Sequence, residues 1–273
     1  MRISELIAPF ESWAPLHLAE GYDNTGLMVG RPDTPCTGVL FSLDCTEAVV
    51  AEAAEKGCNL IISHHPIWFG ARKRLNGTDY VSRTILAAIQ QGIALYAIHT
   101  NLDNVPTGVN HALAKRIGLA GTRILAPRAA DQPQAGAGLI GKLPRPHTPT
   151  ELLDLLAHTF GSPAIRYTLP SGTTRLETVA VCGGAGSFLI EAAREAGAHA
   201  LITADITYHR FFDHEDRLMI LDIGHYESER YTPDMLYAFF REKFLNFAAY
   251  LSEVYTNPVQ YHLHAPAAHG KHS

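Results

Sequence analysis

With 273 residues, 47% of them hydrophobic, and a net charge of −5 with histidine neutral, the chain is expected to form a globular protein with a buried core, and the acidic balance disfavours nucleic acid as a partner. Its four cysteines show no CxxC spacing, the N-terminal MRISELIAPFESW is interrupted by charge and proline, and no stretch reaches membrane-spanning length. We therefore expect a cytoplasmic protein with no disulfide scaffold, signal peptide or membrane span.

The first half of the sequence alternates helical periods with apolar, strand-like runs. The expected elements are, in chain order, a helix from Ile3 that ends before Pro15, a strand over 39–43, a helix capped by Thr46 that stops at Gly57, the strand NLIIS, a helix over about 79–91, the strand ALYAI and the helix GVNHALAKRIG. NLIIS leads directly into His64 and His65, and ALYAI leads into His99 and Asp103.

The second half repeats this alternation. The expected elements are a strand over 139–143, a helix with Thr148 as N-cap, Pro149 at N1 and Glu151 at N3, the strand TVAVC before GGAGS and a helix, the strand ALIT before Asp205, the strand LMILDI before His225, a long helix over 227–247 and a last strand in AYLSEV. The Thr-Pro-Thr-Glu run has the pattern of a capping box, which fixes that helix start.

The Gly/Ala-rich segment RAADQPQAGAG marks a boundary between two lobes. We predict an α/β fold of two interlinked lobes with mostly parallel sheets, lobe one over 1–126 and completed by about 222–260, and lobe two over 127–221. Residues 264–273 are expected to be a disordered tail, so the histidines near this end are discounted as solvated: His262, His264, His269 and His272.

Polar side chains gather just beyond the apolar strands. In open parallel sheets ligand sites form outside the carboxyl ends of the strands, so these groups are expected to converge: His64 with His65, His99 with Asp103, Tyr208 with His209, and His225 with Glu229. Imidazole nitrogens and carboxylate oxygens without cysteine suit Zn, Fe, Mn, Co or Ni. The sequence therefore predicts a metal centre.

The spacing of these ligands favours two ions. Successive side chains of an extended segment diverge, so His64 and His65 would reach two neighbouring ions more easily than one. His225 and Glu229 are spaced i,i+4 and share one face if a helix begins at or just before His225. Taken singly, a His-His pair is more often a core hydrogen-bonding site, and an HxxxE pair commonly stabilises a helix surface.

Three other motifs leave two interpretations open. GGAGS, residues 183–187, is either an anion-binding loop or a tight turn that needs glycine for positive φ. EGYDNTGLMVG is either a substrate loop, through Asp23 and Asn24, or an Asx-type turn. Trp68 and Phe69 either wall the metal site or belong to the core, and the core is favoured.

The motifs YDNTGLMVG, IISHHPIWFG, HTNLDNVPTGVN, ITADITYHRFFD, DIGHYESE and TNPVQYH together resemble those of the NIF-three-like dinuclear metal proteins, often labelled GTP cyclohydrolase 1 type 2 homologues. The resemblance covers nearly the whole chain and is to the compact form without an inserted middle domain. It implies two divalent metal ions per chain, held by His64, His65, Asp103, His225 and Glu229. Where the family usually has Thr-Gly-Asp, this chain has Thr203-Ala204-Asp205.

The same resemblance implies that His99 and Tyr208 or His209 surround the metals or handle protons. It also implies a purine nucleotide substrate, GTP or a relative of it, and a ring-shaped homohexamer. Two hypotheses follow, a metal-dependent hydrolase in which paired ions activate water, and a non-catalytic metal-binding or metal-delivery protein with the same ligands.

Overall fold

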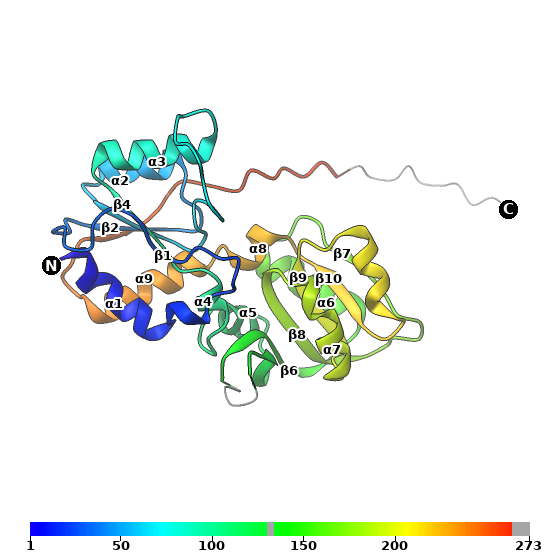
Figure 1. Ribbon diagram of the computed structural model, residues 1–273. Coiled ribbons are helices and arrows are strands. Elements are labelled where there is room, and N and C mark those ends of the chain that lie inside the picture. Colours follow the sequence, from blue (N-terminus) through cyan, green and yellow to red (C-terminus); the bar gives the residue numbers. More distant parts are fainter. Residues whose placement is uncertain (130–133, 264–273) are drawn as a thin grey trace.

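The computed structural model describes residues 1–129 and 134–263. Its chain forms two lobes, each built on one β-sheet with helices on both faces, which Figure 1 shows side by side. The expected α/β class is therefore confirmed. The expected tail, residues 264–273, lies outside the described residues.

The first sheet has the strand order β1-β4-β3-β2-β11. Four of its strands run parallel, and β1 at the edge is antiparallel to β4. The strands are β1 Gly26–Val29, β2 Val39–Ser42, β3 Leu60–Ser63, β4 Ala94–Ala97 and β11 Ala249–Leu251. Every residue of β2, β3 and β4 is buried, as in a parallel sheet covered on both faces.

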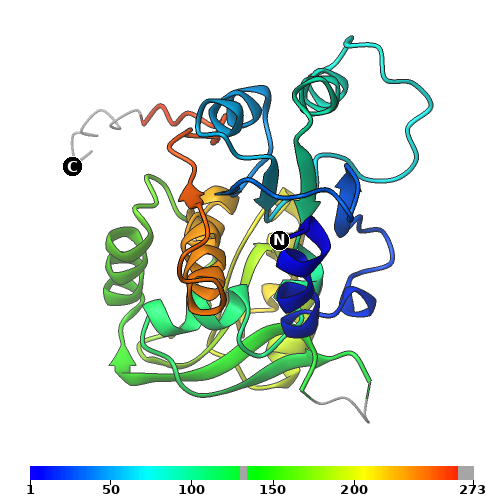
Figure 2. The ribbon, with the colours of Figure 1, turned by 90° about the vertical axis from the view of Figure 1, so that its left-hand side faces the viewer.

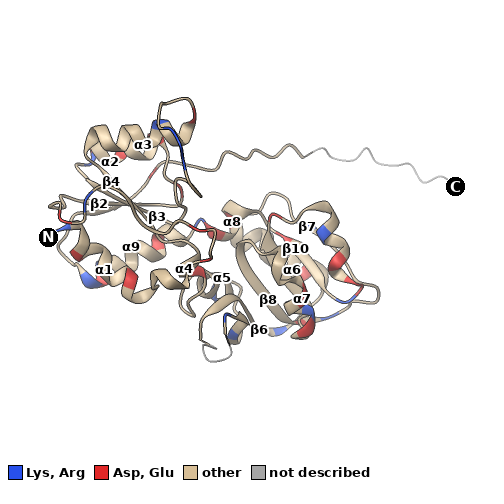
Figure 3. Cartoon of the chain, viewed as in Figure 1, with Lys and Arg blue, Asp and Glu red and all other residues tan. Residues whose placement is uncertain are grey.

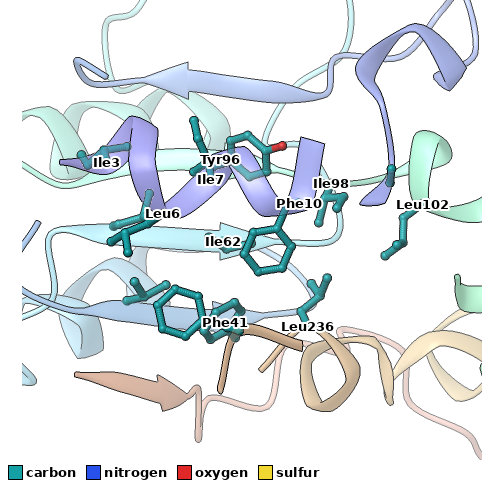
Figure 4. Close-up of a cluster of buried hydrophobic side chains, with 14 of the residues drawn as sticks. Ile3, Leu6, Ile7, Phe10, Phe41, Ile62, Tyr96, Ile98, Leu102 and Leu236 are labelled. Atoms are coloured by element: carbon teal, nitrogen blue, oxygen red, sulfur yellow. The ribbon is translucent and has the colours of Figure 1, made fainter. Parts of the chain in front are cut away.

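Side-chain alternation along these strands divides the core into two layers. Phe41, Ile62 and Tyr96 point to one face, where they pack against the apolar side of α1 and against α9 (Figure 4). The intervening residues Leu40 and Ile61 point to the other face, against α2 and α3. The helices are α1 Ile3–Trp13, α2 Glu47–Glu55, α3 Tyr80–Gln91 and α9 Thr232–Lys243.

The second sheet has the order β5-β6-β8-β9-β10-β7 and is mixed. β8, β9 and β10 are parallel, whereas β5, β6 and β7 pair antiparallel with their neighbours. β5 and β6 follow one another without a crossover helix, and such a short connection requires antiparallel pairing. The strands are β5 Ala120–Pro127, β6 Gly136–His147, β7 Arg166–Tyr167, β8 Leu176–Ala185, β9 Ala200–Ala204 and β10 Met219–Asp222.

Helices cover both faces of the second sheet as well. α5 and α6 pack on one face and α7 on the other. The remaining elements are α4 Thr100–Asp103, α5 Val109–Arg116, α6 Pro149–Phe160, α7 Ile190–Glu195, α8 His225–Glu229 and the 3₁₀ turns η1 Leu16–Leu18, η2 Ser187–Leu189 and η3 Tyr208–His214. The predicted capping box at Thr148 is confirmed, with Glu151 closing it.

The chain crosses between the lobes and returns. After β10 it passes through α8, which lies between the lobes, and then enters α9 and β11 of the first lobe (Figures 1 and 2). The prediction of one long helix over 227–247 is wrong, because α8 ends at Glu229 and α9 begins at Thr232 with Pro233 in its first turn. This break lets α8 belong to the lobe junction and α9 to the first core.

The expected lobe division at residues 126 and 127 falls at the end of β5, a strand that pairs in the second sheet. No helix in the described ranges is long and apolar enough to cross a bilayer.

Candidate metal centre

The predicted ligands meet at the lobe junction. His64 and His65 directly follow β3, Asp103 ends the short helix α4 after β4, and His225 and Glu229 are the first and last residues of α8 after β10. Each lies beyond the carboxyl end of a parallel strand, as the sequence predicted. The five side chains therefore lie close together in the folded chain.

Glu229 occupies the middle of the cluster. Its Oε2 lies 2.9 Å from Nε2 of His65 and 3.0 Å from Nε2 of His225, and these two nitrogens are 3.4 Å apart. Its side chain is only 2% exposed. One buried carboxylate oxygen thus faces two imidazole nitrogens that aim at the same place.

A second trio surrounds the other oxygen of Glu229. Nε2 of His64 lies 3.8 Å from Oε1 of Glu229 and 3.8 Å from Oδ1 of Asp103, too far for a hydrogen bond. Both His64 Nε2 and Asp103 Oδ1 are buried and have no hydrogen-bond partner among the described residues. Orphaned buried polar atoms are rare, so this trio is suited to an additional ligand.

Each of the three cluster histidines is held through its other ring nitrogen. Nδ1 of His64 contacts the carbonyl oxygen of Ile98 at 2.8 Å, Nδ1 of His65 contacts Oδ1 of Asp44 at 2.7 Å, and Nδ1 of His225 contacts Oδ2 of Asp205 at 2.7 Å. An acceptor at Nδ1 places the proton there and leaves Nε2 free to act as a ligand, the arrangement common at metal-binding histidines.

The electrostatics of the cluster favour added positive charge. Burial alone would lower the pKa of His65, but the hydrogen bonds to Asp44 and Glu229 raise it to about 9. Burial would likewise lower the pKa of His225, which Glu229 and Asp205 raise to about 11. Burial raises the pKa of Asp103 to about 7, so this carboxyl competes for a proton. Metal cations at the cluster would balance the charge of the Asp103 and Glu229 carboxylates without protons on the histidines or on Asp103.

The glycines of GGAGS give Glu229 its place. Gly184 has φ of +59°, and a Cβ there would lie 2.4 Å from Oε1 of Glu229. Gly184 N–H donates to Oγ of Ser228, and Gly183 N–H donates to Oδ1 of Asn110. The interpretation as a strand-end turn that requires glycine therefore holds, and the close approach concerns a side chain of the cluster. The helix that follows, α7, has only six residues.

The donor set fits divalent metal ions. Three groups of side chains could each hold an ion: His64 with His65 and His99, His65 with His225 and Glu229, and His64 with Asp103 and Glu229. Histidine nitrogen and carboxylate oxygen without thiolate suit Zn and the neighbouring first-row metals. His65 and His64 belong to different trios around the two oxygens of Glu229, so the cluster offers more than one set of ligand atoms that could hold a metal ion.

His99 stands beside this cluster and is paired with a buried aspartate. Its ring centroid lies 5.2 Å from that of His64 and 5.5 Å from that of His65. Its Nδ1 contacts Oδ1 of Asp23 at 2.9 Å, and the backbone N–H of Thr100 donates to the other oxygen of Asp23. Burial opposes ionisation of Asp23, but His99 and Thr100 lower its pKa to about 2. Asp23 therefore remains a carboxylate that orients His99.

The two other residues predicted to handle protons lie elsewhere. Tyr208 and His209 belong to η3 in the second lobe and are exposed. Tyr208 lines a small cavity with Phe211 and Phe212, and neither Tyr208 nor His209 lines the cavities that reach the metal cluster. The fold brings His99 to the cluster and leaves this pair at a different surface.

Two of the cavities at the cluster are lined by both His65 and His225. One, of about 650 Å³, is lined by Asp44, Asp205 and the C-terminal segment around Asn257. The other, of about 390 Å³, lies against His99, Asp103 and Glu229, where its walls come from both lobes. Both volumes fall in the range of small-molecule sites, which often form where two lobes meet.

The sequence prediction missed the role of Asp44 and Thr256. β2 and β11 are parallel neighbours, so the residues that follow them leave the sheet at the same edge. Oγ1 of Thr256 donates to Oδ2 of Asp44 at 2.6 Å, and Asp44 in turn holds His65. Asp44 lies two residues beyond β2, as His65 lies two residues beyond β3, so the strand-end rule could have found it.

The amino-acid sequence is similar to that of a described protein family and of named relatives. The family model described as Duf34/NIF3 (NGG1p interacting factor 3) matches residues 1–258. A Clostridium perfringens protein named GTP cyclohydrolase 1 type 2 homolog is 36% identical over 230 residues, which cover 84% of this chain and 87% of the relative.

Solved structures agree with this match. The structure of a Bacillus cereus protein related to NIF3 has a TM-score of 0.89 at 24% identity and covers 96% of this chain and 99% of the other, a likeness in fold. A Staphylococcus aureus protein, SA1388, has a TM-score of 0.86 at 29% identity, again over 96% and 99% of the two chains.

Proposed function

Because this chain belongs to the Duf34/NIF3 (NGG1p interacting factor 3) family, we propose that it is a dinuclear metal-dependent hydrolase that acts on a nucleotide or a related small molecule. The observation that carries the proposal is the pair of trios around Glu229, in which three histidine Nε2 atoms and two carboxylates converge. The residues assigned to hold two divalent ions are His64, His65, Asp103, His225 and Glu229.

Divalent ions bound there would activate water and polarise the bond under attack. The chain's own groups prepare the site for this chemistry. Asp44 and Asp205 fix the rings of His65 and His225, so that both Nε2 atoms keep one orientation. Glu229 is itself held in a buried position between Nε2 of His65 and Nε2 of His225.

His99 is the group we assign to proton transfer. Asp23 holds its Nδ1, which leaves Nε2 to exchange a proton with a molecule in the cavity that His99 lines. Asp23 has the orienting role that a carboxylate has beside a catalytic histidine. Since Tyr208 and His209 line neither cavity at the cluster, the proposal gives them no part in this step.

The nucleotide part of the proposal comes from the names of the relatives, several of which are called GTP cyclohydrolase 1 type 2 homologs. GTP is therefore the first substrate to test. The metal-loaded protein is expected to release formate from GTP and to form a fluorescent pterin. If neither product forms while another nucleotide or a phosphodiester is cleaved, the cyclohydrolase version is rejected and the hydrolase remains.

Three variants connect this activity to the cluster. His65→Ala and Glu229→Ala are expected to lose bound metal and activity together, whereas His158→Ala, an exposed histidine on α6, retains both. Unchanged metal content in both cluster variants would contradict the ligand assignment. Circular dichroism of each variant confirms that the fold is retained.

The metal-delivery hypothesis predicts a different result from the same protein. A delivery protein gives its ions to an acceptor apoprotein, whereas a hydrolytic centre retains them through turnover. Rapid transfer to apo-carbonic anhydrase with no cleavage of any nucleotide would replace the hydrolase proposal. A cytoplasmic location and a ring-shaped homohexamer belong to the proposal as well, and light scattering tests the latter.

A further inference from the structure

The cavity beside His99 is surrounded by exposed aromatic side chains from separate parts of the chain. Tyr22, Phe69, Tyr80 and Phe188 all line it, and their exposed fractions are 67%, 53%, 60% and 60%. Single exposed apolar residues are ordinary on a protein surface. Four exposed aromatic rings around one cavity are unusual, and they form a surface suited to a flat ring.

A hydrogen bond joins the two loops that carry Tyr22 and Phe69. Nδ2 of Asn24 donates to the carbonyl oxygen of Trp68 at 3.1 Å, which joins the loop of Tyr22 to the loop of Phe69. The ring centroid of Phe69 lies 5.7 Å from that of His99. Trp68 packs in the core, as predicted, but its neighbour Phe69 faces the cavity. Tyr22 and Phe69 therefore line the cavity from two joined loops, and Phe69 lies next to the proton-transfer group.

The second lobe supplies the opposite side of the cavity. Phe188 lies in η2, directly after the glycine-rich strand end, and the backbone of Gly138 and Gly183 also lines this side. The cavity therefore lies between an aromatic wall on the first lobe and an aromatic residue on the second. A planar ring can stack on such surfaces with either face.

A basic loop begins at the rim of the same cavity. Residues 70–79, here called the basic loop, connect Phe69 to Tyr80 and carry Arg72, Lys73 and Arg74 in succession. Figure 3 shows this stretch in blue before α3, and Figure 2 shows the loop projecting from the first lobe. Arg72 pairs with Asp79, whereas Lys73 and Arg74 form no ion pair with any described residue.

Arg72, Lys73 and Arg74 do not line the cavity, but their loop joins two aromatic residues that do, so the charges are within reach of an anionic group attached to a ring in the cavity. Lys73 is four residues from Phe69, and an extended chain spans at most about 3.6 Å per residue, so its backbone lies within about 14 Å of Phe69. Their long side chains extend this reach. Since the chain as a whole has a net charge of −5, a cationic loop at this rim is a local exception that attracts an anion.

We infer that the cavity between Phe69 and Phe188 binds a planar heteroaromatic ring and that the basic loop binds the phosphate of the same molecule. The substrate class would then be phosphorylated heterocycles, with separate sites for the ring and the phosphate. A catalytic role for this binding rests on the proposed function. It rests on aromatic and cationic side chains outside the metal cluster. A nucleic acid would need a wider basic surface than three residues.

Calorimetric titration of the metal-loaded protein tests this with three probes, GMP, guanosine and ribose 5-phosphate. GMP, which has both ring and phosphate, is expected to bind most tightly. Phe69→Ala and Phe188→Ala are each expected to lower the affinity for GMP and guanosine by about tenfold, because a stacking surface is lost. The affinity for ribose 5-phosphate should stay unchanged. Phe212→Ala, an exposed aromatic outside the cavity, is the control.

The basic loop is tested by the double variant Lys73→Ala/Arg74→Ala. It is expected to lower the affinity for GMP and ribose 5-phosphate by about three- to tenfold in 0.1 M salt, whereas the affinity for guanosine should not change. Arg175→Ala/Arg217→Ala removes the same charge from exposed sites in the second lobe and is expected to change nothing. All of these variants leave the proposed metal ligands intact, so the metal content should stay constant.

The outcomes separate this inference from the proposed function. Ribose 5-phosphate that binds as tightly as GMP, or aromatic variants that bind all probes normally, would overturn the inference even if hydrolysis is found. Selective loss of ring binding in a protein that hydrolyses no nucleotide would support the inference and reject the hydrolase. A change of oligomeric state in Phe69→Ala or Phe188→Ala, with probe binding intact, would reassign these rings to contacts between copies of the chain.

Discussion

Two histidine–aspartate pairs flank Glu229, one from each lobe, and they are built in different ways. In the first lobe, both oxygens of Asp44 are in use, one by His65 and one by Thr256. In the second lobe, Asp205 contacts His225 and its side chain is 55% exposed, against 35% for Asp44. The first pair is secured by several hydrogen bonds, whereas the second depends on the backbone.

The backbone of Asp205 shows what that dependence involves. Its φ is +55°, a left-handed conformation that few residues other than glycine adopt. The next residue secures it, because the N–H of Ile206 donates to Oδ2 of the buried Asp222. The imidazole of His65 is therefore oriented by a network of side chains, whereas that of His225 is oriented by a local conformation of the backbone. Five single variants test this difference.

Glu229→Gln is expected to have the largest effect, because it removes the charge that both pairs share. The amide keeps the volume of the side chain but cannot balance two ions, and metal affinity should fall by more than about 100-fold, beyond the loss typical of an outer partner. Elemental analysis after dialysis measures it. Glu242→Gln, an exposed position on α9, is the control, and equal metal content in the two variants would refute a central role for Glu229.

Gly184→Ala is expected to come next, because it displaces the same carboxylate without altering it. The new Cβ would lie 2.4 Å from Oε1 of Glu229 at a φ of +59°, so both metal binding and stability should fall, the latter by about 1–3 kcal/mol. Gly172→Ala has a similar φ of +70° and nothing within 4 Å. Chemical denaturation should show backbone strain in both variants, with metal loss only in Gly184→Ala.

Asp44→Asn and Asp205→Asn compare the two pairs directly. Asp44→Asn removes a charge that two groups use, and metal affinity should fall by about 10–100-fold. Asp205→Asn should lower the metal affinity less, by roughly tenfold at the lower end of that range, since the pair is more exposed and asparagine tolerates a left-handed backbone. Chelator competition ranks the two. A larger loss for Asp205→Asn would reverse the interpretation of the comparison.

The sequence was sufficient for one part of this site and insufficient for another. His64, His65 and Asp103 follow apolar strands, and that position alone predicts a shared edge of the sheet. The spacing of His225 and Glu229 predicts one helical face, and α8 has it. These features depend on local patterns, which a single sequence contains.

The contacts that hold the partners of the histidines in place depend on tertiary structure that no local pattern encodes. Asp44 and Thr256 are 212 residues apart, and they meet because β11 returns to pair with β2. No glycine at position 205 indicates in the sequence that the backbone there is left-handed. The break between α8 and α9 follows from packing in two different lobes. The strand-end rule therefore brought the five cluster side chains together correctly, but it placed Tyr208 and His209 at the cluster wrongly. It also gave no information on which distant segments pair.

Thr256→Val is expected to have the smallest effect of the five changes, because it alters the outermost contact of the first pair. Valine keeps the shape of threonine but removes the hydroxyl that donates to Oδ2 of Asp44. Asp44 would still accept from His65, so metal affinity should fall only a few-fold, less than for Asp44→Asn, in line with the loss of one hydrogen bond worth about 1 kcal/mol. Thr174→Val, at an exposed site in the second lobe, should have no effect.

The combination of Thr256→Val with Asp44→Asn decides whether the two residues act as one unit. If Thr256 acts only by holding Asp44, the double variant should bind metal no more weakly than Asp44→Asn alone, because the hydroxyl then has no carboxylate left to orient. Losses that add in full would mean that the C-terminal segment supports the centre by another route, such as the wall that Asn257 and Tyr261 contribute to the larger cavity. Chelator competition on the two single variants and the double variant completes the cycle.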